Sequence, residues 1–274
     1  MGAARVAAAK GLEIYWNAPM RENDAQGQIE IVNRAMSRGA KGLILAPVED
    51  RPLVASVHRV LQKETPVVVV GTDLGLEPGR HLAYVLSDEH QAGKLAARHL
   101  GQLLKGKGSI AVLGINRRLT GMADRANSFE TALADEYPDV KVVHRSLAML
   151  SVSQEQQIAE KLLGENPHVD AIVALNESST RGSYYAVSEA GKVKEIHLIG
   201  FDQDMIAQLR SGGIDALIVQ DTNRMGQQAM MLMDEELHGK ASRPYVLVPP
   251  YLATRATIDT DEMRRMVDLA WFVR

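Results

Sequence analysis

Polar side chains follow several apolar runs of the sequence, at the point where each run ends. The stretch HLIGFDQDMIAQLRSGGIDALIVQD (197–221) places Asp202 after one run and Gln220 with Asp221 after the next. Three other runs end in the same way: Thr72 and Asp73 follow VVVVG, Asp88 and Glu89 follow YVLS, and Asn176 follows IVAL. Carboxylates accept hydrogen bonds and amides both donate and accept them, so this mixture suits a polyhydroxylated ligand. Any one Asn or Asp could instead cap the following helix, but five such strand ends in one chain favour binding.

Motifs for phosphate binding, nucleophilic catalysis and metal coordination are absent or out of context. The letters GKGSIA (106–111) match a dinucleotide fingerprint, but their glycines precede a strand instead of following one, so a tight helix-to-strand turn explains them better. The sequence has no P-loop, GxSxG or HExxH motif, and its eight histidines form no metal signature. The absence of cysteine excludes disulfides and thiolate catalysis. We therefore predict a binding protein without cofactor, metal or catalytic residues.

The composition is that of a globular protein. The chain has 274 residues, and 46% of them are hydrophobic. Its net charge is −3, so it lacks the excess of positive charge that is typical of nucleic-acid-binding proteins. No apolar stretch approaches the roughly 20 residues that a membrane-spanning helix needs. The first residues, MGAARVAAAKGLEIYW, do not read as a signal peptide.

Continuous apolar runs alternate with amphipathic helical patterns along the chain. Strands are predicted at 12–17, 42–47, 66–71, 84–88, 109–114, 141–148, 171–176, 196–201, 216–221 and 245–254. Runs without polar alternation are typical of parallel sheets that are covered on both faces. A representative helix has Ile29, Val32 and Met36 on one face, with Gly39 as its stop. Because ten strands would make one large sheet, we predict a doubly wound α/β architecture with two sheets.

The order and spacing of these segments resemble those of type I periplasmic sugar-binding proteins, the ribose-binding kind, and of related lactose-repressor-like regulators. The segments that carry the resemblance are GAKGLILAPVED, TPVVVVGTD, YVLSDEHQAGKLAARHL, DRANSFETAL, VDAIVALNESSTRGSYYAV, IHLIGFDQDMIAQLRSGGIDALIVQDTNRMG and YVLVPPYLAT. Each is weak alone, but the set is specific and covers nearly the whole chain. It implies two doubly wound parallel-sheet lobes joined by three hinge crossings, with ligand closed between them.

The resemblance also implies where the lobes begin and end. The crossings fall near Ser87–Asp88, Asp221–Thr222 and Pro249–Pro250. The lobe boundaries are then 1–87 with 222–249 for the first lobe and 88–221 with 250–274 for the second.

Binding roles carry over from the family by position. Arg125 in RANSF matches an arginine that forks onto sugar oxygens, although a surface helix arginine is an equal alternative. Asn176 and Gln220 match amides at strand ends. Asp202 matches an acid that accepts from two hydroxyls, and we favour this role over an N-cap.

Three further candidates depart from the family pattern. Thr72 and Asp73 stand where the pattern has Asp-Arg, and Glu89 stands where an asparagine is often found. Few aromatic residues are available to stack on a sugar ring. These departures leave the identity of the ligand open, and they affect the predicted fold less.

The leading functional hypothesis is a solute-binding protein of an ABC-type importer. It would be a periplasmic or cell-envelope monomer that closes on a sugar or polyol and delivers it to permease subunits, without contacting nucleic acid or inserting in the membrane. The alternative is the effector-binding domain of a lactose-repressor-like regulator that lacks its DNA-binding headpiece. A doubly wound enzyme is disfavoured by the missing phosphate loops.

The beginning of the chain departs from the family as well. The pattern places one more strand before residues 12–17, inside the first lobe's sheet, and then a whole helix. Here GAARVAAAKG supplies only the end of that helix, with Gly11 as its stop. We therefore expect the neighbours of the missing strand to have unpaired backbone groups.

Overall fold

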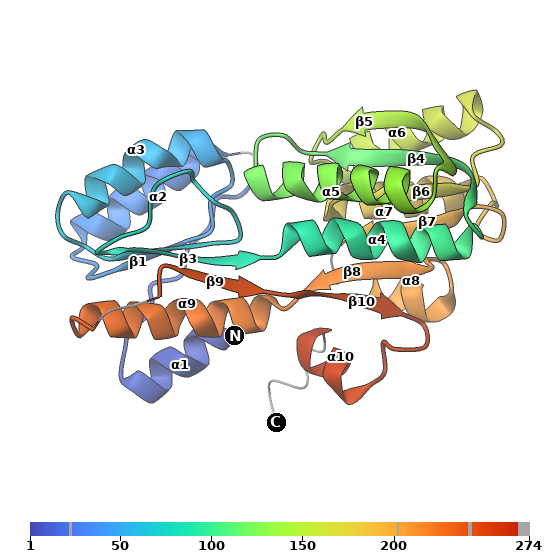
Figure 1. The fold of residues 1–274 in the computed structure, drawn as a ribbon. Helices are drawn as coiled ribbons and strands as arrows, with labels where there is room; N and C mark the ends of the chain where they lie inside the picture. Colours follow the sequence, from blue (N-terminus) through green and yellow to red (C-terminus); the bar gives the residue numbers. More distant parts are fainter. Residues whose placement is uncertain (22–23, 202, 241–242, 268–274) are drawn as a thin grey trace. The chain divides into compact units, whose positions relative to one another are not determined.

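The chain divides into two compact units. The computed structural model describes residues 1–21, 24–201, 203–240 and 243–267 (Figure 1). The first unit comprises Met1–Asp88, Arg118–Gly121 and Asp221–Val248. The second comprises Glu89–Arg117, Met122–Gln220 and Pro249–Arg274. Each unit has its own sheet and its own hydrophobic core.

The first unit contains a parallel sheet of four strands. Their order is β1 (Leu43–Leu45), β2 (Val67–Val70), β3 (Leu82–Ser87) and β9 (Tyr245–Val248). Successive residues of β2 point to opposite faces: Val67 and Val69 pack with Tyr84 in one core cluster, whereas Val68 packs with Val85 in another. Because both faces are buried, the strands consist of continuous apolar residues, as predicted.

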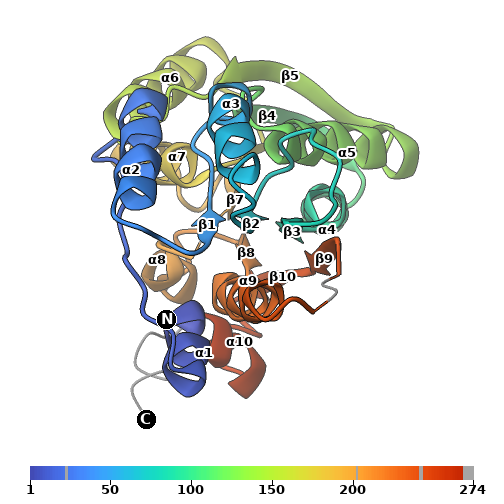
Figure 2. The same ribbon diagram turned by 90° about the vertical axis from the view of Figure 1, so that its left-hand side faces the viewer.

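Helices cover both faces of this sheet. The helices are α1 (Gly2–Lys10), α2 (Ala25–Ser37), α3 (Asp50–Leu61) and α9 (Thr222–Leu237). Figure 2 shows α2 and α3 on one face of β1, β2 and β3, with α1 and α9 on the other. The predicted stripe of Ile29, Val32 and Met36 on α2 packs into the core, and Gly11 ends α1 in the left-handed conformation at φ 67°, so both predictions are confirmed.

The strand predicted at 12–17 is wrong. In the part of the chain that the structure describes, these residues form no strand, and Tyr15 and Trp16 are 51% and 82% exposed. A strand needs a partner for its backbone groups, and residues 12–17 do not pair with any strand among the described residues. In the same part of the chain, β1 pairs only with β2, so its other edge is open.

The second unit contains a sheet of six strands. Their order is β10 (Pro250–Thr254), β8 (Ala216–Gln220), β7 (His197–Phe201), β6 (Ala171–Ala174), β4 (Lys107–Ile115) and β5 (Asp139–Leu147). All neighbours are parallel except β10, which runs antiparallel to β8. The run predicted as one strand at 245–254 is thus two strands that belong to different sheets. They separate at Pro249, which has no N–H to donate to a ladder.

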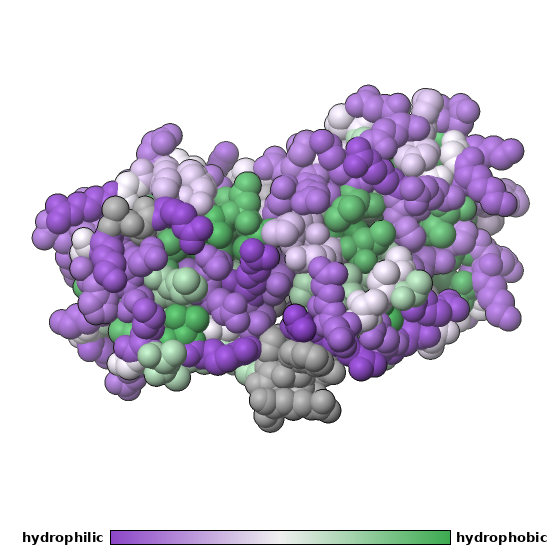
Figure 3. Space-filling model, turned by 60° about the horizontal axis from the view of Figure 1, so that its bottom comes forward, coloured by the Kyte–Doolittle hydropathy of each residue, from purple (hydrophilic) through white to green (hydrophobic). Residues whose placement is uncertain are grey.

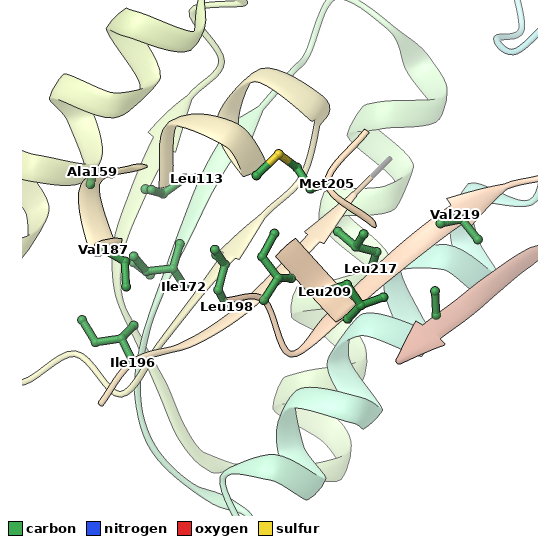
Figure 4. Packing of buried hydrophobic residues seen from close by; sticks show 14 of the residues in the cluster. Leu113, Ala159, Ile172, Val187, Ile196, Leu198, Met205, Leu209, Leu217 and Val219 are labelled. Carbon is green, nitrogen blue, oxygen red and sulfur yellow. The ribbon is translucent and has the colours of Figure 1, made fainter. Parts of the chain in front are cut away.

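Helices also cover both faces of the second sheet. They are α4 (Glu89–Leu103), α5 (Thr120–Glu136), α6 (Val152–Glu165), α7 (Glu177–Glu189), α8 (Ile206–Ser211) and α10 (Asp261–Val267). Residues of α4 and α5 pack on one face, and residues of α6, α7, α8 and α10 on the other. Figure 4 shows part of the latter core, where Leu113, Ile172 and Leu198 from three strands meet Leu209 of α8. The doubly wound α/β architecture is confirmed in both units.

The first glycine of GKGSIA forms a helix-to-strand turn, as the sequence indicates. Gly106 adopts φ 81° and its N–H donates to the Gly101 carbonyl at 2.8 Å, directly before β4 begins at Lys107. The second glycine, Gly108, already lies in β4, so the motif leads into a strand and cannot present a helix N-terminus to a phosphate.

One face of the molecule can be followed in a space-filling view. The face drawn in Figure 3 is largely hydrophilic, with hydrophobic residues in separate small areas. Among the described residues, no helix combines the length and apolar character required to cross a bilayer.

Candidate functional site

Three of the predicted binding residues meet in the second unit. Glu89 is the first residue of α4, Arg125 lies in the first half of α5, and Gln220 is the last residue of β8. Arg125 Nε donates to Glu89 Oε2 at 2.6 Å, and Gln220 Nε2 donates to Glu89 Oε1. Glu89 and Arg125 are 6% and 5% exposed. With Gln220 half-buried, the result is a largely buried polar cluster at the carboxyl end of β8, where α/β proteins place their ligands.

Arg125 also contacts two neighbouring strand ends. Its Nη1 donates to the carbonyl oxygen of Leu175, which directly follows β6, at 2.6 Å. Its Cζ lies 4.3 Å from the centroid of the Phe201 ring at the end of β7. A buried guanidinium requires such partners because burial removes its hydration. Of the two alternatives for Arg125, the surface arginine is therefore wrong.

A glycine of α4 allows this cluster to form. A Cβ on Gly93 would lie 2.1 Å from Ser128 Oγ and 2.3 Å from the Arg125 carbonyl oxygen, so only glycine lets α4 and α5 approach this closely. Ser128 Oγ in turn donates to the Arg125 carbonyl at 3.1 Å. The sequence analysis assigned no role to Gly93, Ser128 or Phe201. The signal that could have found Gly93 is a glycine inside a helical pattern, which usually has a packing reason.

Asn176 caps a helix. Its Oδ1 accepts from the Ser179 N–H at 2.9 Å, and the Ser179 hydroxyl faces the Asn176 N–H in return, which makes a capping box at the start of α7. Its Nδ2 donates to the Gly114 carbonyl at 2.8 Å. A Cβ on Gly114 would lie 2.6 Å from this Nδ2 atom, so the glycine is needed there. The side-chain amide is thus bonded to protein through both its oxygen and its nitrogen, beside the Leu175 carbonyl that holds Arg125.

Thr72 and Asp73 belong to the first unit and are bonded locally. The Thr72 hydroxyl donates to Asp50 Oδ1 at 2.8 Å, and both side chains are buried. Asp73 Oδ1 accepts from the Gly75 N–H at 2.7 Å, which is an Asx turn. The Tyr245 hydroxyl lies 3.5 Å from Asp73 Oδ2. These bonds shape the loop after β2, and a binding role for the pair stays a prediction.

Asp202 lies outside the described residues, so its predicted role stays a prediction from sequence. Within the described ranges, no group of three or more His, Asp or Glu side chains is placed to hold a metal ion.

Comparison with known proteins identifies the family. The model of the family described as "periplasmic binding protein domain" matches residues 1–241. The chain belongs to this family, as its resemblance to type I sugar-binding proteins predicted.

Relatives and solved structures agree with this assignment. The ribose import binding protein of Bacillus subtilis is 27% identical over 237 residues, which cover 85% of this chain and 75% of the relative. A D-apiose import binding protein of Actinobacillus succinogenes is 24% identical, covering 78% and 69%. A carbohydrate-transporter solute-binding protein of Agrobacterium radiobacter, solved with D-arabinose, has a TM-score of 0.90 at 22% identity, covering 97% of this chain and 92% of that one. A periplasmic component of an ABC-type sugar transport system from Hahella chejuensis has a TM-score of 0.86 at 28% identity, covering 92% of each chain.

Proposed function

We propose that this protein is the solute-binding protein of an ABC-type importer and that it binds a sugar or polyol. The observation that carries the proposal is the polar cluster at the carboxyl end of β8, where Glu89 and Arg125 are buried and Gln220 is half-buried. A set of guanidinium, carboxylate and amide groups offers both donors and acceptors, which is what a ring of hydroxyl groups requires. The cluster contains no nucleophile aligned with a base, so it supports binding and not catalysis.

The family relationship supports the same function. The matched relatives include proteins named for the import of ribose and of D-apiose. Location in the periplasm or cell envelope, a monomeric state and delivery to permease subunits follow from that relationship as parts of the proposal. Closure on the ligand is a further part, and small-angle scattering should show a smaller radius of gyration at saturation.

A thermal-shift screen tests the proposed ligand class. Pentoses, hexoses and polyols would be screened against the intact chain, with their phosphates as a separate arm. A ligand that binds only the folded state stabilises it by about 2.7 kcal/mol at a hundredfold excess over Kd, so a true ligand should raise the melting temperature clearly. Stabilisation by phosphorylated sugars alone, or by none of the neutral compounds, would contradict the proposal.

Asp202 provides a residue-level test. Asp202→Ala should weaken sugar binding by about tenfold or more, because it removes a charged acceptor worth about 1.5–3 kcal/mol. Isothermal titration calorimetry with the sugar found in the screen measures the change. An affinity within about twofold of the unsubstituted protein, well below one kcal/mol, would remove Asp202 from the site.

A further inference from the structure

The side chain of Glu89 is committed to two protein donors. Oε2 accepts from Arg125 Nε, and Oε1 accepts from Gln220 Nε2. Glu89 is also 6% exposed, so its carboxylate is enclosed by the protein. A side chain that served mainly as an acceptor for ligand hydroxyls would be expected to keep an oxygen free of protein donors. This one is arranged as the counter-ion of Arg125.

Arg125 has no other ion-pair partner among the described residues. Glu89 is the one carboxylate within 4.0 Å of its guanidinium in the part of the chain that the structure describes. Two further groups of the described residues contact the guanidinium, the Leu175 carbonyl and the Phe201 ring, and neither carries a net charge. The positive charge of Arg125 is therefore balanced inside the protein before any ligand arrives.

The neutralisation of Arg125 by Glu89 disfavours anionic ligands. A buried arginine with a free charge attracts carboxylates and phosphates, which bind it through two parallel hydrogen bonds. Here an anionic ligand at Arg125 would bring a second negative charge close to Glu89, in a region with little water to screen the repulsion. An uncharged polyol meets no such repulsion and can still use guanidinium donors that Glu89 and Leu175 do not occupy.

We propose that Glu89 is the residue that determines ligand charge: by neutralising Arg125 it restricts the site to uncharged sugars and polyols and excludes sugar acids and sugar phosphates. This inference rests on the proposed function, because it assumes that Arg125 faces the ligand. Glu89 acts through Arg125, so it is a positioning and charge-setting residue.

The test compares neutral ligands with charged counterparts of similar size. Calorimetric titrations would use D-galactose with D-galacturonate, D-ribose with D-ribose 5-phosphate, and myo-inositol with its 1-phosphate. The unsubstituted protein should bind a neutral member more tightly than its anionic counterpart by about tenfold or more. Glu89→Gln keeps the shape of the side chain and an oxygen that can accept from Arg125, and it should reduce that preference by about tenfold.

Two controls separate charge at the site from net charge and from folding. Glu130 lies on the same α5 helix and forms a partly exposed pair with Arg145 of β5. Glu130→Gln removes one negative charge from this pair and should leave the preference unchanged. The double variant Glu89→Gln with Arg125→Gln removes both charges and should not gain affinity for the anions. If Glu89→Gln fails to fold, Glu89→Asn replaces it. The role of Glu89 is then judged from the preference for neutral over anionic ligands in the unsubstituted protein and in Glu89→Asn.

The outcomes distinguish failure of the inference from failure of the proposed function. Equal binding of neutral and anionic members by the unsubstituted protein overturns the role of Glu89, as does a preference that Glu89→Gln changes by less than about twofold. Absence of binding by every neutral compound of the thermal-shift screen contradicts the proposed function, and the inference fails with it.

Discussion

Glu89 and Glu155 are both buried glutamates in the first turn of a helix, yet the protein satisfies them differently. Glu89 at the start of α4 is paired with Arg125 and accepts from Gln220. Glu155 in α6 accepts from the Met149 N–H at 2.7 Å through Oε1, whereas its Oε2 has no hydrogen-bond partner among the described residues. Burial raises the pKa of Glu155, and backbone hydrogen bonds from Met149 and Leu150 only partly oppose the rise.

The difference shows what makes a buried carboxylate useful for binding. An acid at a helix N-terminus gains a modest stabilisation from the helix dipole, which both residues share. Of the two, only Glu89 has a cation within 4.0 Å among the described residues, so only at Glu89 does a partner charge offset the cost of burial. Glu155 holds the chain before α6 in place through its hydrogen bond from the Met149 N–H, and burial raises its pKa.

The largest expected effect comes from breaking the pair at Glu89. Arg125→Ala should lower the free energy of unfolding by about 3–5 kcal/mol, because it leaves Glu89 as a buried charge without a partner. Arg145→Ala is the matched control: it breaks a pair in which the side chains are 49% and 32% exposed, and it should cost less than about 1 kcal/mol. Urea unfolding measures both. Similar costs for the two variants would mean that the Glu89–Arg125 pair is solvated in solution.

A substitution at Gly93 tests whether the close approach of α4 and α5 holds the Glu89–Arg125 pair together. Gly93→Ala should destabilise the protein by about 1–3 kcal/mol, because its Cβ would overlap the Arg125 carbonyl oxygen and Ser128 Oγ. Gly164→Ala in α6 is the matched control, since its Cβ would have no neighbour within 4 Å. It should stabilise the protein by up to about 1 kcal/mol through its helix propensity. A Gly93→Ala variant as stable as the unsubstituted protein would contradict the packing argument.

A smaller, pH-dependent effect is expected at Glu155. Because its pKa is higher in the folded state than in the unfolded state, its contribution to stability is fully present below the unfolded value. That contribution is lost as pH rises through the folded value. Glu155→Gln lacks this titration, so its stability relative to the unsubstituted protein should increase from acid towards neutral pH.

Urea unfolding at several pH values checks the prediction for Glu155. Glu160→Gln, at an exposed position of the same α6 helix, should give a profile parallel to that of the unsubstituted protein. A Glu155→Gln profile parallel to both would show that Glu155 finds a partner for Oε2 in solution.

Much of the fold could be predicted because its signals are local. Continuous runs such as Val67–Val70 indicate strands buried on both faces, and the stripe on α2 indicates which side of that helix packs. The strand prediction at 12–17 failed because it rested on residue types alone. A strand also needs a neighbouring strand, which comes from elsewhere in the chain. The separation of 245–254 into β9 and β10 was missed for the same reason: each half pairs in a different sheet.

The candidate site was predicted only as a set of residue types. Its helix-capping part is local, since Asn176 and Ser179 are three residues apart and cap α7 between themselves. The contacts of Glu89 are not local: Arg125 is 36 residues away in sequence and Gln220 is 131 residues away. No periodicity or spacing encodes such contacts.

The sequence by itself determined the doubly wound α/β class, the positions of most helices and strands, and the polar residues that end the strands, because these depend on neighbours within a few turns of the chain. Tertiary structure decided which of these residues act together. It placed Arg125 against Glu89 through a glycine contact between α4 and α5. Within the described ranges it left Glu155 without a cation and the 12–17 segment without a strand partner. The physical reason is that burial makes the state of a charge or of a backbone group depend on the few atoms around it. Folding, and not spacing in the sequence, selects those atoms.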